Sequence, residues 1–163
     1  MEIRARQQDH TTGAARTFGG LMDIYEQNYI RLRRLIPDFD KIGEKAISTV
    51  PNGVDLHYQC LQRSKYTTVF SLTYKFETLE PNLEIRVYHD ARVAEVLACN
   101  VRMEDVHWDG KVSSLFRYGL HNLHSRWRLN RFLNKWLHYC LKQGHKFVPH
   151  SSSWVRAVSP GEI

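Results

Sequence analysis

The sequence predicts an α+β fold: an N-terminal helix, a five- or six-stranded antiparallel meander, and a C-terminal helix packed on one sheet face. Apolar residues recur every three or four positions near both ends of the chain, which is the period of a helix with one buried side. Between residues 45 and 101 they alternate with polar residues, as in a sheet with one apolar face. The connections in this middle region are short, so neighbouring strands are expected to follow chain order.

The first helix is expected between Thr17, which can cap its start, and Pro37, which ends it. Gly19 and Gly20 weaken the first turn, so regular helix is expected to begin nearer Leu21. The apolar side of this helix consists of Phe18, Leu21, Met22, Tyr25, Tyr29, Leu32 and Ile36. This side is predicted to face the sheet.

Turn residues separate the alternating segments of the middle region. Pro51-Asn52-Gly53 lies between predicted strands at residues 46–50 and 54–61, and Asn-Gly tolerates the positive φ angles of a hairpin turn. Further strands are expected over residues 66–76, 83–88 and 92–99. A sixth strand over residues 101–108 is the alternative to a five-stranded sheet.

The second helix is expected over residues 123–143. Gly144 follows its end, where glycine readily takes the left-handed conformation that terminates a helix. Its apolar stripe consists of Leu129, Phe132, Leu133, Trp136, Leu137, Cys140 and Leu141. Two amphipathic helices and a one-faced sheet can bury one another's apolar sides, which completes the predicted fold.

One domain is expected, because 163 residues suit a single core. Residues 1–16 are polar and aperiodic and are predicted to form a flexible arm. The domain is expected over residues 17–146, and residues 147–163 are expected to form a flexible tail that carries Trp154.

The composition is that of a globular protein, with 42% apolar and 25% charged residues. No apolar run is long enough to span a membrane, and no apolar run follows the charged N-terminus as in a signal peptide. Three cysteines, Cys60, Cys99 and Cys140, have no disulfide or metal-binding spacing and are expected to be buried thiols. The sequence therefore predicts a cytoplasmic protein without a cofactor.

The net charge of +6 is unevenly distributed. Residues 110–161 contain nine Lys and Arg and no Asp or Glu, whereas residues 1–109 contain 14 basic and 16 acidic residues. The basic excess therefore belongs to the C-terminal third, where it indicates an anionic partner.

On the second predicted helix the cationic residues recur at steps of three and four, which places them opposite the apolar stripe. They are His124, Arg128, Arg131, Lys135, His138 and Lys142. Two interpretations remain: a solvated face that suits the helix dipole, or a surface that binds nucleic acid or another polyanion. No acidic residue lies four positions from these cations, which favours the polyanion-binding interpretation. Arg31, Arg33 and Arg34 of the first helix are expected to contribute to the same binding surface.

The best catalytic candidates lie at the Tyr88-His89-Asp90 turn, with Glu95 across the hairpin. A histidine beside an aspartate can act as a general base, but adjacent strand residues point to opposite faces and aspartate commonly forms turns. No nucleophile elbow, phosphate-binding loop or zinc-protease motif is present, so a structural role is favoured. No metal site is predicted, because the segment holding His121, His124, His138 and His145 contains no carboxylate.

Four segments resemble the YqiB-like family of small bacterial proteins of unknown function. They are residues 66–68, YTT; residues 87–96, VYHDARVAEV; residues 28–37, NYIRLRRLIP; and residues 130–144, NRFLNKWLHYCLKQG. The resemblance spans about residues 18–145, and the sequence departs from the family pattern between residues 106 and 128. It implies a bacterial origin and supplies no activity.

These observations favour a binding or regulatory module rather than an enzyme. One alternative is a small-molecule enzyme or sensor that uses His89 and Asp90, which requires a concave pocket at that end of the hairpin. Another is an adaptor that receives a protein partner on an exposed apolar patch. The sequence leaves the oligomeric state open.

Overall fold

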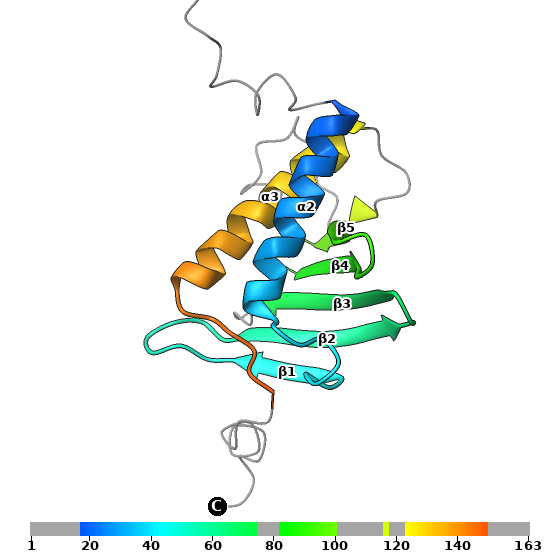
Figure 1. The fold of residues 1–163 in the computed structure, drawn as a ribbon. Coiled ribbons are helices and arrows are strands. Elements are labelled where there is room, and N and C mark those ends of the chain that lie inside the picture. The colour runs from blue at the N-terminus through cyan, green and yellow to red at the C-terminus, as the bar shows by residue number, and fades with distance from the viewer. Residues whose placement is uncertain (1–16, 75–81, 101–115, 118–122, 150–163) are drawn as a thin grey trace, which may run out of the picture.

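The computed structural model describes residues 17–74, 82–100, 116–117 and 123–149. Two helices cover one face of an antiparallel sheet, which confirms the predicted α+β fold (Figure 1). The elements are α2 (Phe18–Leu35), β1 (Lys45–Ser48), β2 (Leu56–Arg63), β3 (Thr67–Tyr74), β4 (Asn82–Tyr88), β5 (Val93–Asn100), β6 (Phe116–Arg117) and α3 (Leu123–Lys142). The predicted arm over residues 1–16, the strand expected over residues 101–108, and Trp154 lie outside the described residues.

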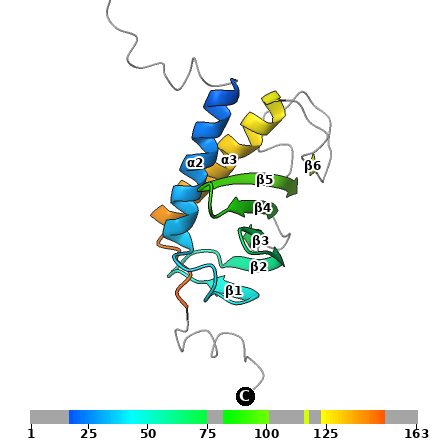
Figure 2. The ribbon, with the colours of Figure 1, turned by 45° about the vertical axis from the view of Figure 1, so that its right-hand side comes forward.

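The strands form an antiparallel meander in the order β1-β2-β3-β4-β5-β6. The predicted alternation is confirmed: Phe70, Leu72 and Ile85 face the helices and are fully buried, whereas Arg86 and Glu95 lie opposite each other on the second face. The sixth strand is the short segment at residues 116–117, which pairs with β5. None of the described helices lies on the second face of the sheet (Figure 2).

The first helix begins earlier than the sequence suggested. The Thr17 side chain accepts a hydrogen bond from the Gly20 N–H at 3.0 Å, so helix α2 starts at Phe18 instead of nearer Leu21. Gly20 is buried in this first turn. The N-cap therefore outweighs the low helix propensity of the two glycines.

Helices α2 and α3 lie side by side and run in the same direction across the sheet (Figures 1 and 2). A buried asparagine, Asn130 of α3, joins the layers. Its side-chain oxygen accepts from the Val96 N–H of β5 at 3.0 Å, and its amide donates to the Arg126 carbonyl at 2.8 Å. Asn28 of α2 donates to the Asn130 carbonyl at 3.3 Å. The helical pair is thus tied to the sheet by polar groups that are completely buried.

The packed part of the chain continues beyond α3. Gly144 has φ of 95° and ends the helix as predicted. His145 then bonds to the Ser48 hydroxyl of β1 at 2.9 Å, and the Phe147 N–H donates to the Leu35 carbonyl at the end of α2 at 2.8 Å. Phe147 is only 1% exposed, so the core includes a residue that the sequence placed in the tail beginning at residue 147. This segment also brings the ends of both helices together.

Candidate functional site

The basic side chains predicted on α3 project from the side of the helix opposite the core. Arg131, Lys135, His138 and Lys142 are exposed, and Arg128 is half-buried. The Arg131 guanidinium lies 4.9 Å from the centre of the Trp127 ring, which holds its aliphatic stem against the helix. None of Arg131, Lys135 and Lys142 forms an ion pair with a carboxylate of the described residues.

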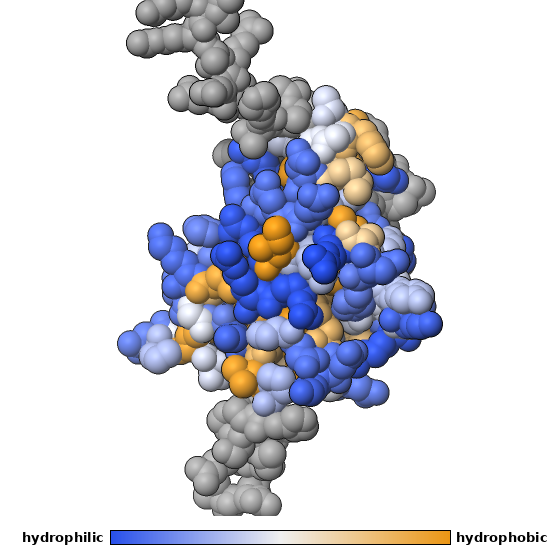
Figure 3. Space-filling view, in the orientation of Figure 1, coloured by the Kyte–Doolittle hydropathy of each residue, from blue (hydrophilic) through white to orange (hydrophobic). Residues whose placement is uncertain are grey.

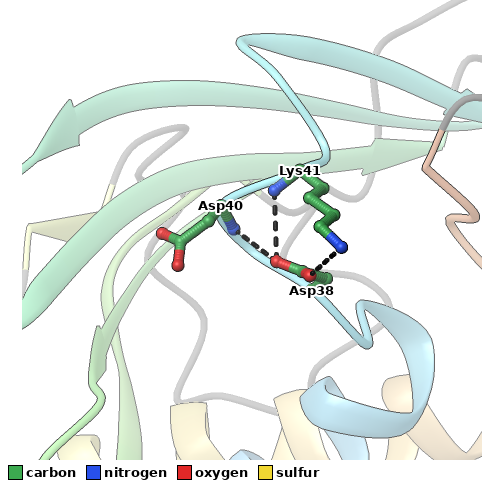
Figure 4. A network of polar contacts seen from close by, with 3 residues as sticks. All are labelled: Asp38, Asp40 and Lys41. Atoms are coloured by element: carbon green, nitrogen blue, oxygen red, sulfur yellow. Dashed lines mark hydrogen bonds and ion pairs between the residues drawn. The ribbon is translucent and has the colours of Figure 1, made fainter.

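An ion pair does form elsewhere, in the connection between α2 and β1. The Lys41 ammonium lies 3.8 Å from the Asp38 carboxylate, which also accepts the backbone N–H groups of Asp40 and Lys41 (Figure 4). The Asp38 carboxylate therefore accepts the backbone hydrogen bonds of its own turn and also pairs with the Lys41 ammonium. The cations of α3 have no comparable neighbour on their own helix, which contains no acidic residue.

The helix dipole explains only part of this charge. Cations are stabilised by the dipole within the last turn of a helix, and in α3 that turn contains Lys142 alone. Arg131 and Lys135 lie further from the end, so their placement has no such electrostatic benefit. Arg131 and Lys135 are therefore exposed cations that neither the helix dipole nor a described carboxylate stabilises.

Helix α2 adds to the same surface. Arg33 and Arg34 are exposed in its last turn and Arg31 is half-buried. Because the two helices lie side by side and their ends meet, their cations occupy one outer layer, which is mostly hydrophilic in Figure 3. We call this surface the basic helical face: Arg31, Arg33, Arg34, Arg128, Arg131, Lys135, His138 and Lys142.

The predicted catalytic candidates do not come together. His89 lies on the helix side of the sheet, where its Nε2 bonds to the Thr68 hydroxyl at 2.8 Å and its ring packs 5.3 Å from Phe39. Asp90 is exposed in the turn. Glu95 lies on the other face of the sheet, opposite Arg86. The geometry therefore supplies no histidine–carboxylate pair at this turn and supports the structural role of His89.

Glu95 belongs to a small polar cluster on the second face. The Tyr88 hydroxyl donates to Glu95 at 2.8 Å and accepts from Arg86 at 3.2 Å. Burial raises the pKa of Tyr88, which keeps this donor protonated. A pocket of about 220 Å³ opens beside the cluster and is lined by Gln62, Ser64, Thr67, Val69, Arg86 and Tyr88.

A second, larger groove of about 690 Å³ lies between α2 and the β4–β5 turn. Its lining consists of Glu26, Tyr29, Ile30, Arg33, Arg34, Ala91 and Arg92. Neither His89 nor Asp90 lines the pocket beside Tyr88 or this larger groove, although both cavities lie near the predicted hairpin end. Neither Ile30 nor Arg92 was predicted from the sequence as a site residue. An apolar residue on the otherwise polar side of α2 was the signal for Ile30; Arg92 had no comparable local signal.

Two histidines, the half-buried His89 and the buried His145, make the stability of the folded chain depend on pH. Burial lowers the pKa of both His89 and His145, so the folded chain keeps them neutral. Below a pH of about 6.5 the unfolded chain takes up protons that the folded chain resists, and stability is lost as the pH falls. We expect the urea midpoint to be level from pH 8 to 7 and to decrease from pH 6.5 to 5. The variant His145→Asn should flatten that decrease; an unchanged pH profile in this variant would contradict the assignment.

The structure defines a two-layer α+β domain in which two helices cover one face of an antiparallel sheet. None of the described helices is long and apolar enough to cross a membrane. The chain belongs to the family described as "Protein of unknown function (DUF1249)", which matches residues 31–146. It is 30% identical over 139 residues to "Uncharacterized protein YqiB" of Escherichia coli strain K12, covering 81% of this chain and 94% of the relative. The YqiB proteins of strains O6:H1 and O157:H7 match equally. No solved structure matches the chain.

Proposed function

We propose that this protein is a binding module that engages nucleic acid, or a polyanion of similar charge density, through the basic helical face. The observation that carries the proposal is that Arg131, Lys135 and Lys142 of α3 are exposed and form no ion pair with a carboxylate of the described residues. Like charges on one side of a helix repel one another and cost stability. A row of phosphates would relieve this repulsion and release condensed counterions.

The spacing of the cations suits an extended anionic chain. Arg128 and Lys142 are separated by about 21 Å along the axis of α3, at 1.5 Å per residue. Arg131 and Lys135 lie between them on the same side. At about 3.4 Å per nucleotide, the row covers about six nucleotides of one strand. A cytoplasmic location, where nucleic acid is available, is part of this proposal and is supported by three free cysteines.

Charge reversal tests the proposal. The variant Arg131→Glu/Lys135→Glu/Lys142→Glu should lose heparin retention and should bind a fluorescent mixed-sequence RNA about 100-fold more weakly at low salt. The slope of log K against log salt should become less steep by about 2, since three phosphate contacts are removed. Binding is measured by fluorescence anisotropy over a salt series.

The matched control is Lys41→Glu/Lys45→Glu/Lys65→Glu. These lysines are exposed and lie outside both helices, and the variant has the same net charge as the test variant. It should keep most of the affinity. Equal losses in the two variants would mean that net charge alone is responsible, and absence of RNA binding by the unmodified protein at low salt would overturn the proposal.

A further inference from the structure

The groove between α2 and the β4–β5 turn, which we call the Arg92 groove, combines cationic and apolar surface. Three arginines line it, Arg33 and Arg34 of α2 and Arg92 of the turn, and Glu26 is the one acidic residue of the lining. None of the three arginines forms an ion pair with a carboxylate of the described residues. Guanidinium groups favour phosphate and carboxylate ligands, which they can bind through two parallel hydrogen bonds.

The same groove contains apolar surface next to these charges. Ile30 is 53% exposed, and the half-buried Tyr29 beside it packs against the main core and contributes to the lining of the groove. The surface seen in Figure 3 is mostly hydrophilic with scattered apolar residues, and the two helices also expose Phe18, Leu123 and Tyr139. A ligand that fills the groove should therefore have both a planar or apolar part and an anionic part.

The backbone of Arg92 gives an independent reason to assign a role to its side chain. Arg92 has φ of 56°, a left-handed conformation that is unfavourable for residues with a Cβ and is more readily adopted by Gly or Asn. Strained residues of this kind concentrate at functional sites. Turn geometry alone would be better served by glycine. Arg92 lines the groove, and contact of its side chain with a ligand there would account for arginine at this position.

We propose that the Arg92 groove holds one unpaired nucleotide, with its base against Tyr29 and Ile30 and its phosphate on Arg33 and Arg92. This inference rests on the proposed function and narrows its ligand to single-stranded nucleic acid. Bases stack on exposed side chains only when they are unpaired, whereas the cations of α3 contact phosphates of either form. Arg34 lines the groove and belongs to the basic helical face, so one strand can reach both surfaces.

The variant Arg92→Gly separates binding from folding. Glycine relieves the backbone strain, so the melting temperature should stay the same or increase. Affinity for a fluorescent 12-nucleotide oligouridylate should decrease about 10-fold, and affinity for a 12-base-pair RNA duplex by twofold or less. Arg92→Lys, which keeps the charge without the planar fork, should give an intermediate loss.

The apolar surface is tested with Ile30→Ser, which changes no charge. Its matched control is Leu61→Ser, since Leu61 is 47% exposed on β2. Ile30→Ser should weaken oligouridylate binding about fivefold and leave duplex binding unchanged, whereas Leu61→Ser should affect neither. Uridine monophosphate at millimolar concentration should compete with the oligonucleotide at the groove in the unmodified protein and not in Arg92→Gly.

The outcomes distinguish this inference from the proposed function. Equal affinity for single strand and duplex, unchanged by Arg92→Gly, would overturn the assignment of the groove and leave polyanion binding by α3 intact. Failure of the unmodified protein to bind either RNA would overturn both. Equal weakening of both RNAs by Arg92→Gly would make Arg92 a general phosphate contact and would also overturn the nucleotide assignment.

Discussion

Replacing Phe147 with alanine is expected to lower the free energy of unfolding by about 4 kcal/mol, the usual cost of removing a fully buried aromatic side chain. The Phe147 ring is 1% exposed and lies 6.0 Å from the ring of Tyr58 in the main core. It also anchors the segment that follows α3 beside the end of α2. Truncation therefore leaves a cavity and loosens the contact between the two helix ends.

Urea unfolding followed by circular dichroism measures this effect. The control is Val148→Ala, because Val148 is the next residue and is 46% exposed. We expect a change of about 0.5 kcal/mol or less for the control. Similar effects of the two variants would mean that Phe147 belongs to a flexible tail, as predicted from the sequence, and not to the core.

Replacing Asn130 with alanine is expected to cost about 3 kcal/mol. The Asn130 side chain is the acceptor for the Val96 N–H, and both residues are completely buried. Alanine leaves that N–H without this partner in a site that water does not reach, and it opens a cavity between α3 and β5. The better helix propensity of alanine offsets only a small part of the loss.

A control with the same chemical change lies one turn further along α3. The amide nitrogen of Asn134 is buried and has no hydrogen-bond partner among the described residues, so Asn134→Ala removes no such bond. This control should change stability by less than about 1 kcal/mol. The same urea titration compares the two variants, and a loss at Asn134 as large as that at Asn130 would contradict the role given to the Val96 hydrogen bond.

Part of the candidate surface could be predicted from local spacing. Arg131, Lys135 and Lys142 share a side of α3 because helical geometry alone relates residues three and four apart. The structure adds that their side chains are exposed and have no ion-pair partners among the described carboxylates. The sequence could not supply this, because a carboxylate from any distant segment could have approached them.

The Arg92 groove could not be predicted from residues that are close together in the sequence. Tyr29 and Arg92 are more than 60 positions apart in the sequence, and they line one groove only because α2 packs across the β4–β5 hairpin. The left-handed backbone of Arg92 was also hidden, since arginine is not a residue that marks such a conformation. Asn130 was missed for a related reason: a polar residue in a helix usually indicates a solvated side, and its buried partner lies on β5.

The sequence by itself determined the types of the elements, their order, the side of each that enters the core, and the concentration of positive charge in the C-terminal third. These properties follow from spacing along the chain, which backbone geometry converts directly into shared faces. Only the tertiary structure decided that α2 and α3 run side by side, that Phe147 enters the core, that His89 and Glu95 are separated by the sheet, and that Arg92 faces Tyr29 across a groove. These features depend on contacts between distant segments, whose geometry is set by how the layers pack.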